Sequence, residues 1–164
     1  MADIIQRLEQ RLYGLEKTIC SISLLVMLFA VAFGVCIRFF NLPIPNVAEW
    51  AIVAISPLTF VGTAMCERMR SHISVDMIDQ ARSPWVRKLA HLVVALLMIV
   101  FSFLYAWLGW ILLVDVAETG ERLLDMGTPL TIPIFFLFSG MVLLSIHCLC
   151  ELARLAGILP AQTA

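Results

Sequence analysis

The segment Glu67–Lys88, ERMRSHISVDMIDQARSPWVRK, decides the fold of this chain, because it is the longest polar interruption between long apolar stretches. It holds five of the eleven Lys and Arg residues of the 164-residue chain. On each side of it lie two apolar stretches of about twenty residues or more, the length that crosses a hydrocarbon core. The segment therefore predicts two pairs of membrane spans joined by one polar hinge.

The composition supports a lipid environment. Hydrophobic residues make up 62% of the chain and charged residues only 14%, whereas a soluble domain is about half apolar and about a quarter charged. In lipid, backbone groups must be satisfied within helices or a closed barrel. Because the apolar stretches are long and do not alternate with polar residues, we expect an all-α integral membrane protein. The net charge of −1 argues against a nucleic-acid partner.

One four-helix membrane domain is expected over residues 1–164. Leu8, Leu12 and Leu15, with Ile4 and Ile19, recur at spacings of three and four. This stripe predicts a short amphipathic helix over 3–17 on the membrane surface; a frayed polar tail is the alternative. The remaining expected elements are spans at 18–40, 47–66, 84–117 and 131–152, a polar loop over 67–83 and an outer loop over 118–130.

Basic residues are distributed unevenly between the two sides of this layout. Nine of them fall in the N-terminal segment, the hinge and the C-terminal tail, and only Arg38 and Arg122 fall on the other side. Loops rich in Lys and Arg stay in the cytoplasm. We therefore expect both termini and the hinge to be cytoplasmic and the acidic stretch around Glu118 to face outward.

Ionisable residues are almost absent from the middle of the spans. Arg38, Glu49 and Asp115 lie at or near span ends, whereas transporters of charged solutes keep such groups at mid-membrane. The chain alone therefore shows no solute path. For Glu49, an ion pair with Arg38 across the turn between the first two spans is favoured over a coupling carboxylate like that of four-helix drug exporters.

Histidines and cysteines are the residues that most often bind metals and haem. His91 and His147 are expected at the same membrane depth on antiparallel spans, where two histidines can ligate one b-type haem. The competing interpretation is two interfacial histidines that bond to backbone or water. The chain has five cysteines, which we interpret as small buried hydrophobic residues and not as metal ligands or disulfide partners. They are Cys20, Cys36, Cys66, Cys148 and Cys150.

A family resemblance rests on the hinge. The motif Arg68-x-x-x-His72-Ile-Ser-Val-Asp76, after Gly62 and a second span that opens with Glu49-Trp50, resembles the small permease subunit of tripartite ATP-independent periplasmic (TRAP) transporters. The four-span layout and the sequence TPLTIP at the entry to the last span, which contains Gly140, fit the same family. The resemblance covers essentially the whole chain.

The resemblance implies a non-catalytic, multi-pass subunit of the bacterial inner membrane. In that family a periplasmic substrate-binding protein delivers an organic acid to a large multi-span subunit, which moves it by symport with sodium. The small subunit is expected to extend and stabilise the large subunit's scaffold among the membrane lipids and to help dock the binding protein. No cofactor or metal is expected on this chain, and the substrate, such as a dicarboxylate or sialic acid, stays open.

The same resemblance gives candidate roles to individual residues. His72 and Asp76 are four apart and are expected to meet on a helical turn, and the long third span is expected to tilt. Candidates for docking are Asp115, Glu118, Glu121 and Asp125, for which a merely solvated loop is the alternative. Candidates for structural or partner contacts are Arg38, Glu49, Trp50, Pro57, Arg68, His72, Asp76, Trp107 and Trp110.

Two other functions stay open. One is a haem- or quinone-binding membrane anchor of a respiratory complex, which haem absorbance of the purified protein would support. The other is an independent small transporter, for which uptake by this chain alone would be the mark.

Overall fold

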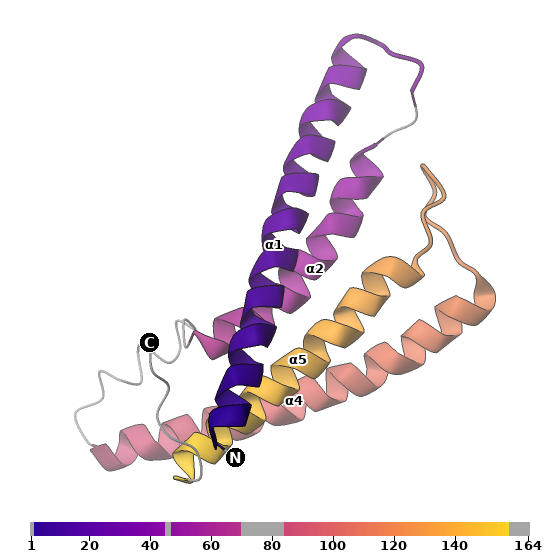
Figure 1. Cartoon of the computed structure of the whole chain (residues 1–164). Coiled ribbons are helices and arrows are strands. Elements are labelled where there is room, and N and C mark those ends of the chain that lie inside the picture. Colours follow the sequence, from indigo (N-terminus) through magenta and orange to yellow (C-terminus); the bar gives the residue numbers. More distant parts are fainter. Residues whose placement is uncertain (1, 45–46, 70–83, 158–164) are drawn as a thin grey trace.

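The computed structural model of the chain describes residues 2–44, 47–69 and 84–157, and within them the protein is built from long helices. The prediction of an all-α protein is confirmed: four of the described helices are long and apolar enough to cross a membrane. They are α1 (Ala2–Phe39), α2 (Ala48–Arg68), α4 (Pro84–Thr119) and α5 (Thr131–Leu155) (Figure 1).

The helices lie in the order α1, α2, α5, α4, because α1 packs on α2, α2 on α5, and α5 on α4. α1 and α2 form one antiparallel hairpin, and α4 and α5 form another. The two inner helices, α2 and α5, run parallel to each other (Figure 1). The end at which α1 begins and α5 ends is called the termini end below. The opposite end, which holds the turn after α1 and the loop before α5, is called the loop end.

α1 presents one continuous inward face from Glu9 to Ile37. Its inward residues alternate at spacings of four and three, the 3.5-residue period that keeps one face of a helix on its neighbour. Most of them are small or polar, which allows the close approach that helices in lipid require. These residues are Glu9, Tyr13, Glu16, Cys20, Ser23, Met27, Ala30, Gly34 and Ile37.

The first part of α1 differs from the amphipathic surface helix expected over 3–17. The helix continues without a break near residue 17. Leu8 and Leu15 are 57% and 61% exposed, whereas Glu9 and Glu16 are only 4% and 1% exposed. The polar face turns inward because charged partners on α2 and α5 receive the two carboxylates. Contact of the exposed leucines with a membrane surface stays a prediction.

The core is centred on the contact between α2 and α5, with α4 packed against it. Gly140 lies against the backbone of Phe60, and the hydroxyl of Ser145 on α5 lies 3.0 Å from that of Ser102 on α4. The buried cluster at this contact consists of Ala64, Met141, Leu144 and Cys148, with Met98, Ile99 and Ala106 of α4 packed against it.

The helix bounds refine the expected hinge and outer loop. α2 runs through Arg68 and α4 begins at Pro84, so both ends of the segment 67–88 are helical. α2 also passes through Pro57, which lies inside the helix and does not end it. His72 and Asp76 lie outside the described residues. At 1.5 Å per residue, the 36 residues of α4 extend about 54 Å, longer than a hydrocarbon core of about 30 Å.

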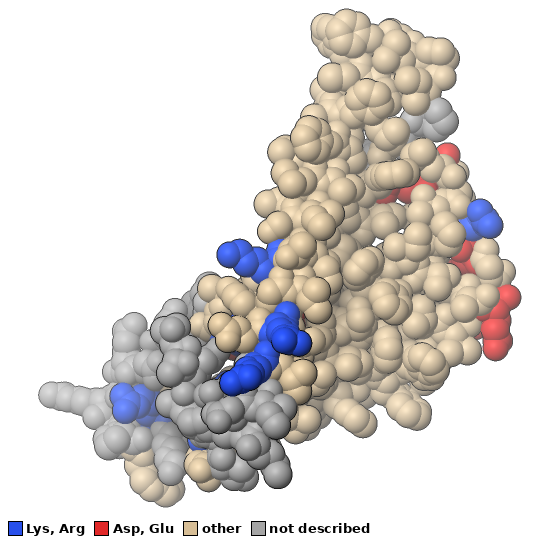
Figure 2. Space-filling view, viewed as in Figure 1, with Lys and Arg blue, Asp and Glu red and all other residues tan. Residues whose placement is uncertain are grey.

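Large apolar side chains cover the outer faces of the helices, while charges gather at the two ends. Leu24, Leu28 and Val35 are exposed on α1, and Leu97 and Val100 on α4. Figure 2 shows, on one face of the molecule, most visible Lys and Arg side chains toward the termini end and the visible Asp and Glu side chains toward the loop end, where a basic side chain lies among them. This surface is typical of a protein surrounded by lipid or by an apolar partner.

Candidate functional site

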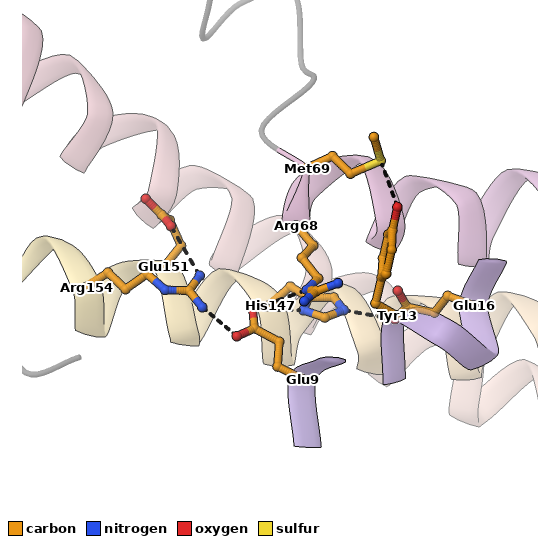
Figure 3. Close-up of polar contacts among 8 residues, drawn as sticks. All are labelled: Glu9, Tyr13, Glu16, Arg68, Met69, His147, Glu151 and Arg154. Carbon is orange, nitrogen blue, oxygen red and sulfur yellow. Dashed lines mark hydrogen bonds and ion pairs between the residues drawn. The ribbon is translucent and has the colours of Figure 1, made fainter. Parts of the chain in front are cut away.

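A group of charged side chains is buried at the termini end, where α1, α2 and α5 meet (Figure 3). α1 contributes two carboxylates, α2 a guanidinium, and α5 an imidazole, a carboxylate and a second guanidinium. We refer to this group as the buried ion cluster. Its members are Glu9, Glu16, Arg68, His147, Glu151 and Arg154.

Glu9 is the central carboxylate of the buried ion cluster. It accepts a hydrogen bond from Nη2 of Arg154. Its Oε1 atom lies 3.8 Å from Nε of Arg68 and 3.8 Å from Nδ1 of His147, beyond hydrogen-bonding distance. Glu9 thus connects α1 with both inner helices. Arg154 is held on its other side by Glu151, one turn earlier on α5, at 3.6 Å.

His147 lies between two carboxylates of α1. Its Nε2 atom is 2.8 Å from Oε1 of Glu16, a short hydrogen bond, and its Nδ1 atom faces Glu9. The imidazole is only 2% exposed. Both ring nitrogens therefore point toward acidic oxygens and away from solvent.

A second set of contacts joins α1 to α2 beside the cluster. The guanidinium carbon of Arg68 lies 4.4 Å from the centroid of the Tyr13 ring, a cation–π geometry. The hydroxyl of Tyr13 donates to the sulfur of Met69 at 3.6 Å (Figure 3). Arg68, a predicted structural residue, is thus placed within the structure by both an aromatic ring and a carboxylate.

The chemistry of the cluster favours a joint between helices. Burying a single charge is costly, and a buried pair repays that cost only with good geometry and further hydrogen bonds. Among the residues that the structure describes, no group of three or more His, Cys, Asp or Glu side chains is arranged to hold a metal ion. The arrangement binds three helices together and holds a titratable imidazole at its centre.

At the loop end another buried carboxylate holds the outer loop. Glu49, in the first turn of α2, is 2% exposed and accepts three backbone N–H groups. The donors are Asp125 at 2.8 Å, Met126 at 2.7 Å and Thr128 at 3.0 Å. The oxygens of Glu49 are thus occupied by the loop before α5, and no ion pair with the exposed Arg38 is present in the described part of the chain. The expectation of a Glu49–Arg38 ion pair is wrong, because the Glu49 oxygens accept hydrogen bonds from backbone N–H groups of the outer loop instead.

The outer loop itself is a compact turn. Arg122 and Pro129 form an antiparallel bridge, and the N–H of Leu123 donates to the carbonyl of Thr128 at 2.9 Å. Gly127 adopts a φ of 72° inside the turn, a conformation that glycine enters without strain. The loop presents Leu124, which is fully exposed. The predicted docking residues Asp115, Glu118, Glu121 and Asp125 are all exposed, the first two on α4.

The predicted tryptophans lie on outward faces. Trp50, Trp107 and Trp110 are each at least half exposed, and Trp110 also packs against Phe138 of α5, with ring centroids 5.4 Å apart. Their contact with a membrane interface or a partner stays a prediction. Pro57 is buried within α2.

The two histidines proposed as haem ligands are not brought together. The contact between Ser102 and Ser145 sets a register that places His147 at the level of residue 100 on α4. His91 is about nine residues away along that helix, or roughly 13 Å. His147 is paired instead with Glu16 from α1.

Glu9, Glu16, Glu151 and Arg154 were missed as site residues by reasoning from the sequence. A signal for them exists: Glu9 and Glu16 are seven residues apart, and so are His147 and Arg154. Seven residues are close to two helical turns, so each pair shares one face. Two acids on one helix face and two nitrogen bases on another predict a charged contact between helices.

In the part of the chain that the structure describes, the fold and these two sites define a small helical protein with four helices long and apolar enough to cross a membrane and with buried charges paired between its own helices and loop. Consistent with this, the family model described as "Tripartite ATP-independent periplasmic transporters, DctQ component" matches residues 19–157. The chain therefore belongs to the DctQ family, the small subunits of TRAP transporters, and the predicted family is confirmed. Comparison with curated proteins and with solved structures gave no match.

Proposed function

We propose that this chain is a non-catalytic scaffold subunit that braces the large permease subunit of a TRAP transporter and does not itself carry the substrate. The observation that carries this proposal is where the charges lie. The stretches 18–37, 50–66, 92–114 and 132–146 contain no Asp, Glu, Lys, Arg or His, and the buried charges at the two ends are occupied by groups of the same chain. A transport path for an anion and its coupling ion needs ionisable side chains at mid-membrane.

The division of labour follows from this arrangement. Transport of an organic acid, such as a dicarboxylate or sialic acid, and its coupling to sodium fall to the large subunit. The outer faces of α1 and α4 carry exposed apolar residues such as Leu28 and Leu97. These faces fit one apolar partner and the surrounding lipid, and they widen the scaffold of the complex in the inner membrane.

The orientation follows from the positive charges. Most of the described Lys and Arg residues lie at the termini end, and because loops rich in these residues stay in the cytoplasm, we assign this end to the cytoplasm. The loop end then faces the periplasm, where the loop held by Glu49 is available to the substrate-binding protein.

Reconstitution into liposomes tests the scaffold role. Three preparations are compared, each with the binding protein: the large subunit alone, this chain alone, and both together. Sodium-driven uptake of the organic acid is expected only when both subunits are present, with none from this chain alone. Uptake by this chain alone would overturn the proposal in favour of an independent transporter. A Soret band in the purified chain would favour the haem anchor.

Charge reversal tests the docking role of the outer loop. Glu118→Lys with Glu121→Lys is expected to raise the KM for loaded binding protein and to change its dependence on salt, because complementary charges steer association. Arg7→Glu with Arg11→Glu, at the termini end, is the matched control and is expected to leave KM unchanged. Unchanged kinetics in the loop variant would mean that this loop is solvated and plays no part in docking.

A further inference from the structure

The buried ion cluster holds a titratable group that the proposed scaffold role does not use, the imidazole of His147. A neutral imidazole donates from only one ring nitrogen, whereas an imidazolium donates from both. Here Nε2 lies 2.8 Å from Glu16, and Nδ1 lies 3.8 Å from Glu9. Both Nδ1 of His147 and Oε1 of Glu9 are buried without a hydrogen-bond partner. A small rotation of the ring brings Nδ1 into direct hydrogen-bonding distance of ionised Glu9 only if Nδ1 carries a proton, because two acceptors cannot bond to each other.

The surrounding charges favour a further proton. Among the described residues, the charged side chains around His147 come from three helices. They are Glu9 and Glu16 of α1, Arg68 and Glu67 of α2, the latter beside Cys148, and Glu151 and Arg154 of α5. On α4 the facing stretch 92–104 contains no ionisable side chain. The groups that face the two ring nitrogens are both carboxylates, and a positive charge on the ring compensates the cost of burying them.

The first turns of α1 depend on this cluster for their attachment. Within residues 7–17 the fully buried side chains are Glu9 and Glu16, while the leucines Leu8 and Leu15 are exposed. Polar contacts, more than apolar packing, thus hold this segment to α2 and α5. We propose that His147 is a proton-binding site, and that its bound proton fastens residues 7–17 of α1 to α5.

This fastening is present while the proton is bound and is lost as the pH rises far enough to remove it. Loss of the proton turns one imidazole nitrogen into an acceptor that faces a carboxylate. The carboxylate that faces this nitrogen is then repelled, the ring no longer carries a positive charge to hold both Glu9 and Glu16 to α5, and the N-terminal turns of α1 open. The opening exposes a segment that lies at the cytoplasmic end in the proposed orientation, although the proton site itself does not depend on that orientation.

The full chain in lipid nanodiscs, labelled with ¹⁵N at histidine, gives the direct test. His147 is expected to show the shifts of a doubly protonated ring at pH 7, with signals assigned from His147→Gln and His91→Gln. Hydrogen exchange of amides 7–17, corrected for intrinsic rates, is expected to rise by about tenfold in one step as the pH increases. His147→Gln is expected to lack the step and exchange rapidly throughout, while His91→Gln keeps it.

Glu16→Gln keeps the shape of the site and guards against a folding defect in the histidine variant. The substitution removes the negative charge of the side chain at residue 16, beside the imidazole ring, and is expected to move the exchange step to lower pH. A neutral His147 ring at pH 7 in the unaltered chain, an exchange step that survives in His147→Gln, or a step that Glu16→Gln leaves in place would each overturn the proposal.

Discussion

Gly140 of α5 lies directly against the backbone of Phe60 of α2. A Cβ atom at residue 140 would lie 2.6 Å from the carbonyl carbon of Phe60 and 2.8 Å from its carbonyl oxygen. These are backbone atoms, so a change of rotamer cannot relieve the overlap. The two inner helices can approach this closely only because residue 140 has no side chain, and close approach is the main source of helix association in lipid.

Gly140→Ala is therefore expected to push α2 and α5 apart and to lower the free energy of unfolding by about 1–3 kcal/mol. Gly109→Ala is the matched control. There the added Cβ would meet Cδ2 of Leu137 at 2.6 Å, the far end of a flexible side chain that can move aside. Thermal unfolding in detergent measures both variants, and an equal loss in the two would contradict the role given to residue 140.

Glu49 is expected to set the conformation of the outer loop. Replacing it with alanine removes the acceptor of the Asp125, Met126 and Thr128 amides, and three buried donors without partners are strongly unfavourable. Exchange of these amides is expected to rise by about tenfold or more, with a smaller rise for Glu49→Gln, which keeps one oxygen. Glu121→Gln, an exposed acid in the same loop, is expected to change little. Slow exchange in Glu49→Ala would show that the loop holds itself.

Much of the fold could be predicted because lipid permits few solutions. Apolar stretches of span length fix the number of helices, and Pro84 and Thr131 mark where α4 and α5 begin. The order of helices in space could not be predicted in the same way. It depends on small residues such as Gly140, whose packing partner is decided by shape and leaves no periodic signal in the sequence.

The buried ion cluster shows where sequence reasoning failed. The leucine stripe that includes Leu8 and Leu15 predicts a helix lying on the membrane surface, an interpretation that gives Glu9 and Glu16 no partner within the protein. A hydrophobic stripe usually marks the buried face of a helix, but in lipid this preference weakens, since the outside of the molecule is apolar too. The charged face then turns inward wherever a neighbouring helix offers partners, as α5 does with His147 and Arg154.

The hydroxyl contact between α4 and α5 is expected to contribute little. Ser145 has one proton to share between Ser102 at 3.0 Å and the carbonyl of Met141 at 2.9 Å. Ser102 likewise has the carbonyl of Ile99 at 3.1 Å as an acceptor. A double-mutant cycle with alanine is expected to give a coupling of about 0.6 kcal/mol or less. Ser139, which bonds only within its own helix at Phe136, is the control and should show no coupling to Ser102. A coupling above about 1.5 kcal/mol would make this pair a principal joint.

Glu9 and Arg154 are expected to be strongly coupled, because each is buried and the two share a hydrogen bond across 145 residues of sequence. Glu9→Met alone leaves the guanidinium buried without its main acceptor, and Arg154→Met alone leaves the carboxylate short of a donor. Each single change is expected to cost about 3–5 kcal/mol. The double variant is expected to lose less free energy of unfolding than the two single variants together, since neither charge of the pair is then left buried without its partner. Arg11→Met, on the exposed face of the same helix, should stay within about 0.5 kcal/mol. Additive losses in the double variant, measured by unfolding in mixed micelles, would show that the two side chains act independently and that α1 is held to α5 by other contacts.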